Sequence, residues 1–91
     1  PVITTIWLGH NRIKDEGIDM FVQAQWPHLI DLFLDDNFIT DRGAAVLTRL
    51  FAVRRLGLHT NCLTQAGIRV LQKHSYDTLW THSQRNAVPA K

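Results

Sequence analysis

Apolar and polar positions follow a pattern that occurs three times in this chain. Residues 6–13, 32–39 and 56–63 each carry apolar side chains at their first, third and eighth positions and an asparagine at the sixth (Asn11, Asn37, Asn61). A glycine follows each segment after four residues: Gly17, Gly43 and Gly67. The asparagines are 26 and 24 residues apart. A fixed period in this range is typical of stacked repeats.

Each copy changes its hydrophobic period part-way along. Ile6 and Leu8 alternate with Thr5, Trp7 and Gly9, so they predict a short strand with one buried face. After the glycine, Ile18, Phe21 and Val22 fall on one face of a helix. Each copy is therefore expected to form a strand followed by a helix.

The second copy has the clearest helix signals. Thr40 is suited to cap a helix that starts near Asp41, and Asp41 complements the positive end of the helix dipole. We expect this helix to run to about Leu50 and to bury Ala44 and Leu47. Thr64 repeats the cap in the third copy.

The repeat pattern predicts a single domain over residues 1–91. The repeats cover about 3–28, 29–52 and 53–75, and a degenerate half-repeat covers 76–91. Terminal repeats are commonly atypical.

The degenerate half-repeat allows two alignments. A shift of 25 residues from Asn61 reaches Asn86, whereas pairing Leu79 and Thr81 with the earlier strands uses a different register. We expect Tyr76, Leu79 and Trp80 to cover the last helix.

The repeated pattern is L-x-x-L-x-L-x-x-N-x-[IL]-x-x-x-G-[AI]-x-x-[LF], which resembles leucine-rich repeats over residues 3–75. The trailing glycine and helix are most similar to the ribonuclease-inhibitor-like subclass. Residues 37–45 resemble the repeats of GALA-type bacterial effectors. Nothing in this chain resembles the F-box that often accompanies those repeats.

The resemblance implies an α/β fold, a right-handed βα solenoid with a parallel sheet on its concave face and helices on its convex face. The spacing of the elements agrees with this curvature. The axes of packed helices lie about 10 Å apart, whereas paired strands lie about 4.8 Å apart, so the stack bends toward the sheet.

Asn11, Asn37 and Asn61 are predicted to form a structural ladder. A carboxamide both donates and accepts, so it can satisfy backbone groups where each strand bends into its turn. The glycines are expected to let the helices approach the sheet closely, with a positive φ as the competing explanation.

Composition excludes few functions. Ten basic and eight acidic residues give a net charge of +2. Residues 1–45 carry a net charge of −4 and residues 46–91 a net charge of +6. No apolar run reaches the roughly 20 residues of a membrane helix. One cysteine and no signal-peptide pattern favour the cytoplasm, or a host cytoplasm for an effector.

The strand positions that the repeat leaves free are the candidate binding residues. Trp7 and Phe33 occupy equivalent places in adjacent strands and should stand about 5 Å apart. An exposed aromatic pair beside carboxylates is typical of a protein-binding surface. The leading hypothesis is a non-catalytic interaction module without cofactors, whose concave-face residues are Trp7, Asp31, Phe33, Asp35, Asp36, Arg55 and His59.

Two other classes of function stay open. His59, Cys62, His74 and His82 are candidate metal ligands, although their spacing matches no compact Cys/His signature and no metal is predicted. The basic half is a candidate for an acidic ligand or nucleic acid, although its basic residues come from different faces. That set is Arg49, Arg54, Arg55, Arg69, Lys73 and Arg85.

The first repeat has no predicted neighbour on one side. Ile3, Ile6, Leu8 and Ile18 would form a bare apolar flank beside an unpaired strand edge. We expect either self-association through this edge or, as the favoured interpretation, a longer parent array of which this is the C-terminal part.

Overall fold

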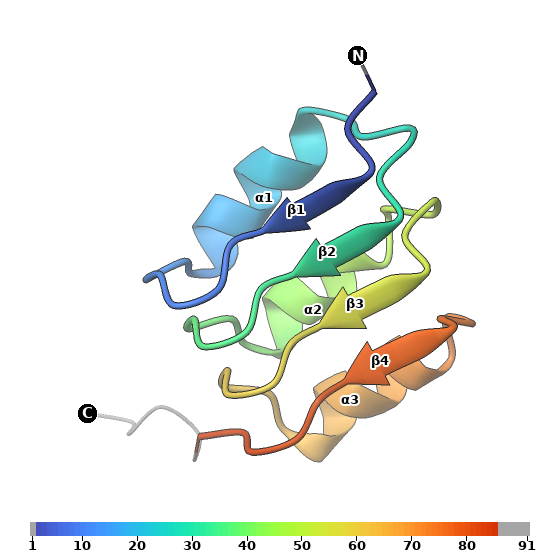
Figure 1. Cartoon of the computed structure of the whole chain (residues 1–91). Helices are drawn as coiled ribbons and strands as arrows, with labels where there is room; N and C mark the ends of the chain where they lie inside the picture. The colour runs from blue at the N-terminus through green and yellow to red at the C-terminus, as the bar shows by residue number, and fades with distance from the viewer. Residues whose placement is uncertain (1, 86–91) are drawn as a thin grey trace.

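The computed structural model describes residues 2–85, which form four strands and three helices in strict alternation (Figure 1). The strands are β1 (Thr5–Trp7), β2 (Asp31–Phe33), β3 (Arg55–Gly57) and β4 (Thr78–Trp80). The helices are α1 (Asp15–Gln23), α2 (Asp41–Leu47) and α3 (Gln65–Gln72). The protein is therefore an α/β fold built from strand–helix units.

The strands form one parallel sheet in chain order, β1-β2-β3-β4. Ile6 pairs with Leu32, Leu32 with Leu56, and Leu56 with Leu79. The predicted alignment of the first three copies is confirmed by this register. All three helices cover the same face of the sheet (Figure 1), which leaves the opposite face open. We call that opposite face the open face.

The core lies between the sheet and the helices. Inward strand residues such as Leu32 and Leu56 are fully buried, as are Leu47 and Leu71 from the helices. Each such side chain contributes about 1.5–3 kcal/mol by leaving water. The units at the centre of the stack supply most of this core, because Ile6 is only partly buried.

Two helix predictions need correction. The helix from Asp41 ends at Leu47 rather than near Leu50, because Thr48 closes it by donating its hydroxyl to the carbonyl of Ala45 at 2.6 Å. Thr40 does occupy the N-cap position, but its side chain makes no capping bond to its own helix. It bonds instead to Asp15 of the preceding unit.

The last unit is better formed than the sequence predicts. β4 is a complete member of the sheet, and Leu79 takes the inward position in register with Leu56. Leu79 and Tyr76 pack against the core, but Trp80 lies on the open face and does not cover the last helix. The alternative Asn86 alignment is wrong for the strand, and Asn86 itself lies outside the described residues.

None of the helices in residues 2–85 has both the length and the apolar character that a membrane crossing requires.

Candidate binding surface on the open face

Three rows of side chains cross the open face, and the strand register fixes their membership. The first row begins at Thr5 and the second at Trp7, and the third lies just beyond the strand ends. The rows are Thr5, Asp31, Arg55 and Thr78; then Trp7, Phe33, Gly57 and Trp80; then Gly9, Asp35, His59 and His82.

The second row forms a continuous aromatic strip, which we call the aromatic row (Trp7, Phe33 and Trp80). The Trp7 and Phe33 rings stack with centroids 4.2 Å apart, close to the predicted spacing. Phe33 and Trp80 lie 5.6 Å apart, although β3 separates their strands. Gly57 makes this contact possible, because a Cβ there would come within 3.0 Å of the Phe33 ring. Trp7 is 72% exposed, so the row presents a large apolar surface to solvent.

Asp31 and Arg55 neutralise each other within the first row. The Arg55 guanidinium donates to both carboxylate oxygens of Asp31, and Thr5 donates a third bond at 3.1 Å. The pKa of Asp31 is lowered chiefly by the hydrogen bond from Arg55, which also raises the pKa of Arg55. This pair fixes side-chain positions but leaves little unpaired charge for a partner.

Asp36 is also paired. His10 Nδ1 lies 2.7 Å from its carboxylate, and Arg85 forms an ion pair with the other oxygen. The hydrogen bond with His10 lowers the pKa of Asp36 and raises the pKa of His10. Arg85 also bonds the carbonyls of Asn37 and Thr60, so it ties the fourth unit to the second and third.

Asp35 has a different environment. No arginine or lysine in residues 2–85 pairs with it, and its nearest basic groups are His59 Nε2 at 3.6 Å and His10 Nε2 at 3.7 Å. Its side chain is only 18% exposed. Gly9 makes room for it, since a Cβ there would lie 2.8 Å from the carboxylate. Asp31 and Asp36 each pair with an arginine, so Asp35 differs from the other two predicted acidic residues in this respect.

A depression of about 360 Å³ joins Asp35 to the aromatic row. His59 and His82 form one wall, with parallel rings 4.6 Å apart. The depression is lined by Trp7, Phe33, Asp35, Gly57, His59, Trp80 and His82. Its aromatic faces and one carboxylate suit a cationic or aromatic side chain. The sequence placed four of these residues in the binding set and missed the contribution of the glycine between them.

Carboxamides connect neighbouring units behind this surface. Asn37 accepts a hydrogen bond from the Ile13 N–H at 2.9 Å and donates to the carbonyls of Leu8 and Leu34 at 3.0 Å. Asn61 makes the same contacts one unit later. Within residues 2–85, Asn11 by contrast donates only to its own turn.

Gln84 extends this arrangement to the fourth unit. Its side-chain oxygen accepts from the Leu63 N–H at 2.9 Å, and its amide donates to the Leu58 carbonyl at 2.8 Å. Gln84 therefore takes the place of the asparagine in the fourth unit, whereas Trp80 and His82 lie in the rows of the open face. Its position three residues after Thr81 matches the spacing of each asparagine from the last inward strand residue.

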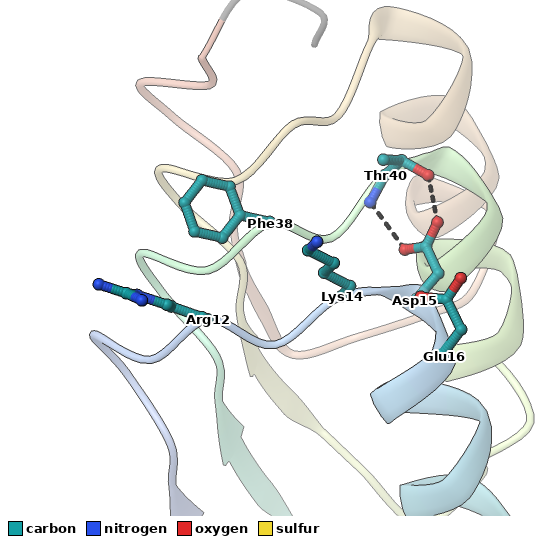
Figure 2. Close-up of a pocket in the computed structure, with 6 residues that line it drawn as sticks. All are labelled: Arg12, Lys14, Asp15, Glu16, Phe38 and Thr40. Atoms are coloured by element: carbon teal, nitrogen blue, oxygen red, sulfur yellow. Dashed lines mark hydrogen bonds between the residues drawn. The ribbon is translucent and has the colours of Figure 1, made fainter.

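A second set of contacts joins the helix starts. The Asp15 carboxylate accepts the backbone N–H of Thr40 at 2.9 Å and also its hydroxyl, as Figure 2 shows. Asp41 does the same for Thr64. Gly43 and Gly67 adjoin these carboxylates, and neither glycine has a positive φ. Close approach is thus the correct explanation for these glycines, but the neighbour is an aspartate rather than the sheet.

A larger cleft of about 740 Å³ lies at the start of α1 and is lined by Arg12, Lys14, Asp15, Glu16, Phe38 and Thr40. Arg12 points away from the other labelled side chains (Figure 2). Asp15 is already bonded to Thr40, and the remaining charges are mixed in sign. This cleft therefore offers no convergent set of groups for a ligand.

The candidate residues of the two alternative functions, a metal site and a basic surface, lie apart or are paired with acidic residues. Cys62 is buried, and the His74 ring packs against Tyr76. Neither side chain therefore joins His59 and His82, whose rings stack on the open face. Within residues 2–85, no group of three or more histidine, cysteine, aspartate or glutamate side chains is arranged so that it could hold a metal ion. Within the basic half, Arg54 pairs with Asp77 at 2.7 Å, in addition to the pairs of Arg55 and Arg85.

Comparison with family models, with curated proteins and with solved structures gave no match for this chain.

Proposed function

We propose that this chain is a non-catalytic protein-interaction module, a leucine-rich-repeat-like βα solenoid whose open face is the concave recognition surface. The parallel sheet, the constant register and the one-sided helices support this architecture. Because helices are wider than strands, a stack of such units curves toward its sheet.

The observation that carries the proposal is the aromatic row beside Asp35. Exposed, stacked aromatic rings expose apolar area at low conformational cost, and such residues dominate the binding energy of protein interfaces. Asp35 lies at the edge of this row without an arginine or lysine partner in the described part of the chain. The partner is therefore a protein surface that brings apolar groups to the aromatic row and a basic side chain to the depression.

A capture experiment with paired variants tests this proposal. Immobilised parent chain and the Trp7→Ala/Phe33→Ala variant are compared for proteins retained from lysate and identified by mass spectrometry. The matched control is Met20→Ala/Phe51→Ala, because Met20 and Phe51 are also strongly exposed apolar residues but lie in α1 and after α2. Circular dichroism establishes that all three chains are folded.

The proposal requires that a defined protein is lost from the Trp7→Ala/Phe33→Ala variant and is retained by the control. Equal retention by both folded variants would rule out the open face as the binding surface.

A basic surface for nucleic acid is less well supported. Three of the six basic residues that the sequence nominates are paired with acidic residues. Non-specific nucleic-acid binding needs unpaired positive charge that is free to replace counterions along one stripe.

A further inference from the structure

We propose that the depression beside Asp35 binds an arginine side chain of the protein partner in preference to lysine. This preference rests on the proposed function and adds to it the side chain that the depression selects. The depression combines a carboxylate, two stacked imidazole rings and the rings of the aromatic row. Each of these groups favours a planar guanidinium over an ammonium group.

The Asp35 carboxylate is largely covered but weakly bonded. Its side chain is 18% exposed, and the closest approaches of its basic neighbours are 3.6 Å from His59 Nε2 and 3.7 Å from His10 Nε2. Both distances exceed that of a hydrogen bond. A carboxylate in such a position is stabilised most by a donor group that reaches both of its oxygens at once.

The pair of Asp31 and Arg55 on the same face shows how such a carboxylate is satisfied. These residues lie opposite each other in the register of β2 and β3, and the guanidinium donates to both carboxylate oxygens. Four residues further along the chain, Asp35 and His59 take the corresponding places. An imidazole cannot direct two parallel N–H groups at one carboxylate. Asp35 therefore lacks the two-pronged donor that Asp31 has within the chain.

Arg85 shows that a guanidinium also suits an aromatic surface beside a carboxylate. It pairs with Asp36 and at the same time lies over the Phe38 ring, 4.7 Å from the ring centre. The depression offers the same combination, because the parallel rings of His59 and His82 line it together with a carboxylate. A guanidinium can bond the carboxylate and stack on a ring plane, whereas an ammonium is a compact, strongly hydrated charge.

The aromatic row provides a surface for the rest of the arginine side chain. The depression of about 360 Å³ extends from Asp35 to Trp7, Phe33 and Trp80. Long cationic side chains pack their methylene groups on apolar surface and hold the charged end at a polar group. An arginine whose guanidinium bonds Asp35 would therefore place its methylene groups on the aromatic row.

A trimethylated lysine is the competing cation for an aromatic site. Such a cation is bound by the faces of several rings. Here the Trp7 and Phe33 rings stack with centroids 4.2 Å apart, and the two histidine rings also stack, so these rings cover part of one another's faces. A trimethylated ammonium also has no N–H group to donate to Asp35. The depression therefore favours arginine over this cation as well.

NMR titrations of the full chain test the preference. The probes are Nα-acetyl-arginine methylamide and the matching derivatives of lysine, trimethyl-lysine and citrulline, which has the shape of arginine without its charge. The readouts are the indole N–H signals of Trp7 and Trp80 and the imidazole signals of His59 and His82. These side chains line the depression.

We expect saturable shifts with the arginine probe and a dissociation constant about tenfold or more below that of the lysine probe. One further hydrogen bond to a charged group corresponds to a factor of this size. The trimethyl-lysine probe should also bind more weakly than arginine. The citrulline probe should give no saturable shift, because it carries no charge for Asp35.

Two variants with the same change of charge separate Asp35 from the charge of the whole molecule. Asp35→Asn should abolish the saturable arginine response. Asp19→Asn should keep it, because the Asp19 carboxylate pairs with Arg42 and lies in α1, on the helix side of the sheet (Figure 1). The NMR spectrum of each variant establishes that it is folded.

A second pair of variants adds an arginine to the chain itself. His59→Arg should place a guanidinium opposite Asp35, as Arg55 lies opposite Asp31, and should abolish the response to the arginine probe. Gln72→Arg is the control, because Gln72 is exposed at the end of α3, and it should leave the response unchanged.

Three results would overturn the preference: a lysine or trimethyl-lysine probe that binds as tightly as arginine, an arginine response that Asp35→Asn leaves unchanged, or no saturable shift with arginine. None of them decides the proposed function, which the capture experiment with Trp7→Ala/Phe33→Ala tests separately. A protein that is captured through the aromatic row by a chain without an arginine response would refute the arginine preference and leave the interaction function in place.

Discussion

Asp41 and Gly67 belong to neighbouring units, and the Asp41 carboxylate fills the space that a side chain at residue 67 would need. The same carboxylate bonds the backbone N–H of Thr64 at 2.8 Å and the Thr64 hydroxyl. The aspartate at the start of one helix therefore requires a glycine in the helix of the next unit.

Gly67→Ala should destabilise the fold by about 1–3 kcal/mol, the usual effect of overpacking a filled site. Adding Asp41→Ala should not add its full separate effect, because the overlap is then removed. A double-mutant cycle by urea unfolding measures the coupling. Strictly additive effects would show that the two residues do not share this space.

Asn37→Ala should lower the free energy of unfolding by several kcal/mol. Removing its side chain leaves the part-buried Ile13 N–H and the Leu8 and Leu34 carbonyls without that partner, and each buried orphaned group costs about 1–3 kcal/mol. Asn11→Ala is the control, because Asn11 is exposed and bonds only its own turn. If the two alanine variants melt at the same temperature, the ladder does not stabilise the stack.

Thr60 lies in the left-handed region with φ of 58°, where a β-branched residue is strained. Thr60→Asn should raise stability by about 1 kcal/mol, because asparagine tolerates this conformation. Thr60→Val keeps the branching and should bring no gain. Thermal unfolding of the two variants separates relief of backbone strain from loss of the hydroxyl, and a gain with valine would refute the strain argument.

The His10–Asp36 pair predicts a defined pH window. The pKa of His10 is raised above 6.5, so the stabilisation that its protonation contributes is complete below that value and is lost as the pH rises through the higher folded-state pKa. The pKa of Asp36 is lowered below 3.8, so its contribution is present above 3.8 and is lost as the pH falls through the lower folded-state pKa.

Between about pH 4 and pH 6 both groups are charged and the pair contributes fully. Asp36→Asn should move the pKa of His10 back toward 6.5, which NMR titration of the imidazole measures directly. A His10 titration that is unchanged in this variant would mean that the hydrogen bond does not form in solution.

The sequence predicted the strands and their register well, for a physical reason. Leu32 and Leu56 must alternate with outward residues to bury one face of the sheet, and the fixed period then brings equivalent leucines side by side. Trp7 and Phe33 follow from the same register, because outward positions align whenever inward ones do.

The features that could not be predicted from the sequence are side-chain contacts between neighbouring units. Gln84 replaces asparagine with a side chain longer by one methylene, so the repeat pattern did not reveal it. Asp15 and Asp41 each lie at the start of a helix, where an acidic residue is favoured by the dipole of that helix. Their type therefore gave no sign of the bonds that they make to the next unit. Arg85 reaches two units back, and no local pattern encodes such a distance.

Site-specific photo-crosslinking is the direct test of whether the open face binds a protein partner. p-Benzoylphenylalanine replaces Trp7 in one chain and Phe51 in another; these exposed positions lie on the open face and after α2. Both chains are irradiated in lysate, and the adducts are identified by mass spectrometry. We expect one defined protein adduct from position 7 and none of that protein from position 51. An adduct from position 51 with none from position 7 would contradict this expectation.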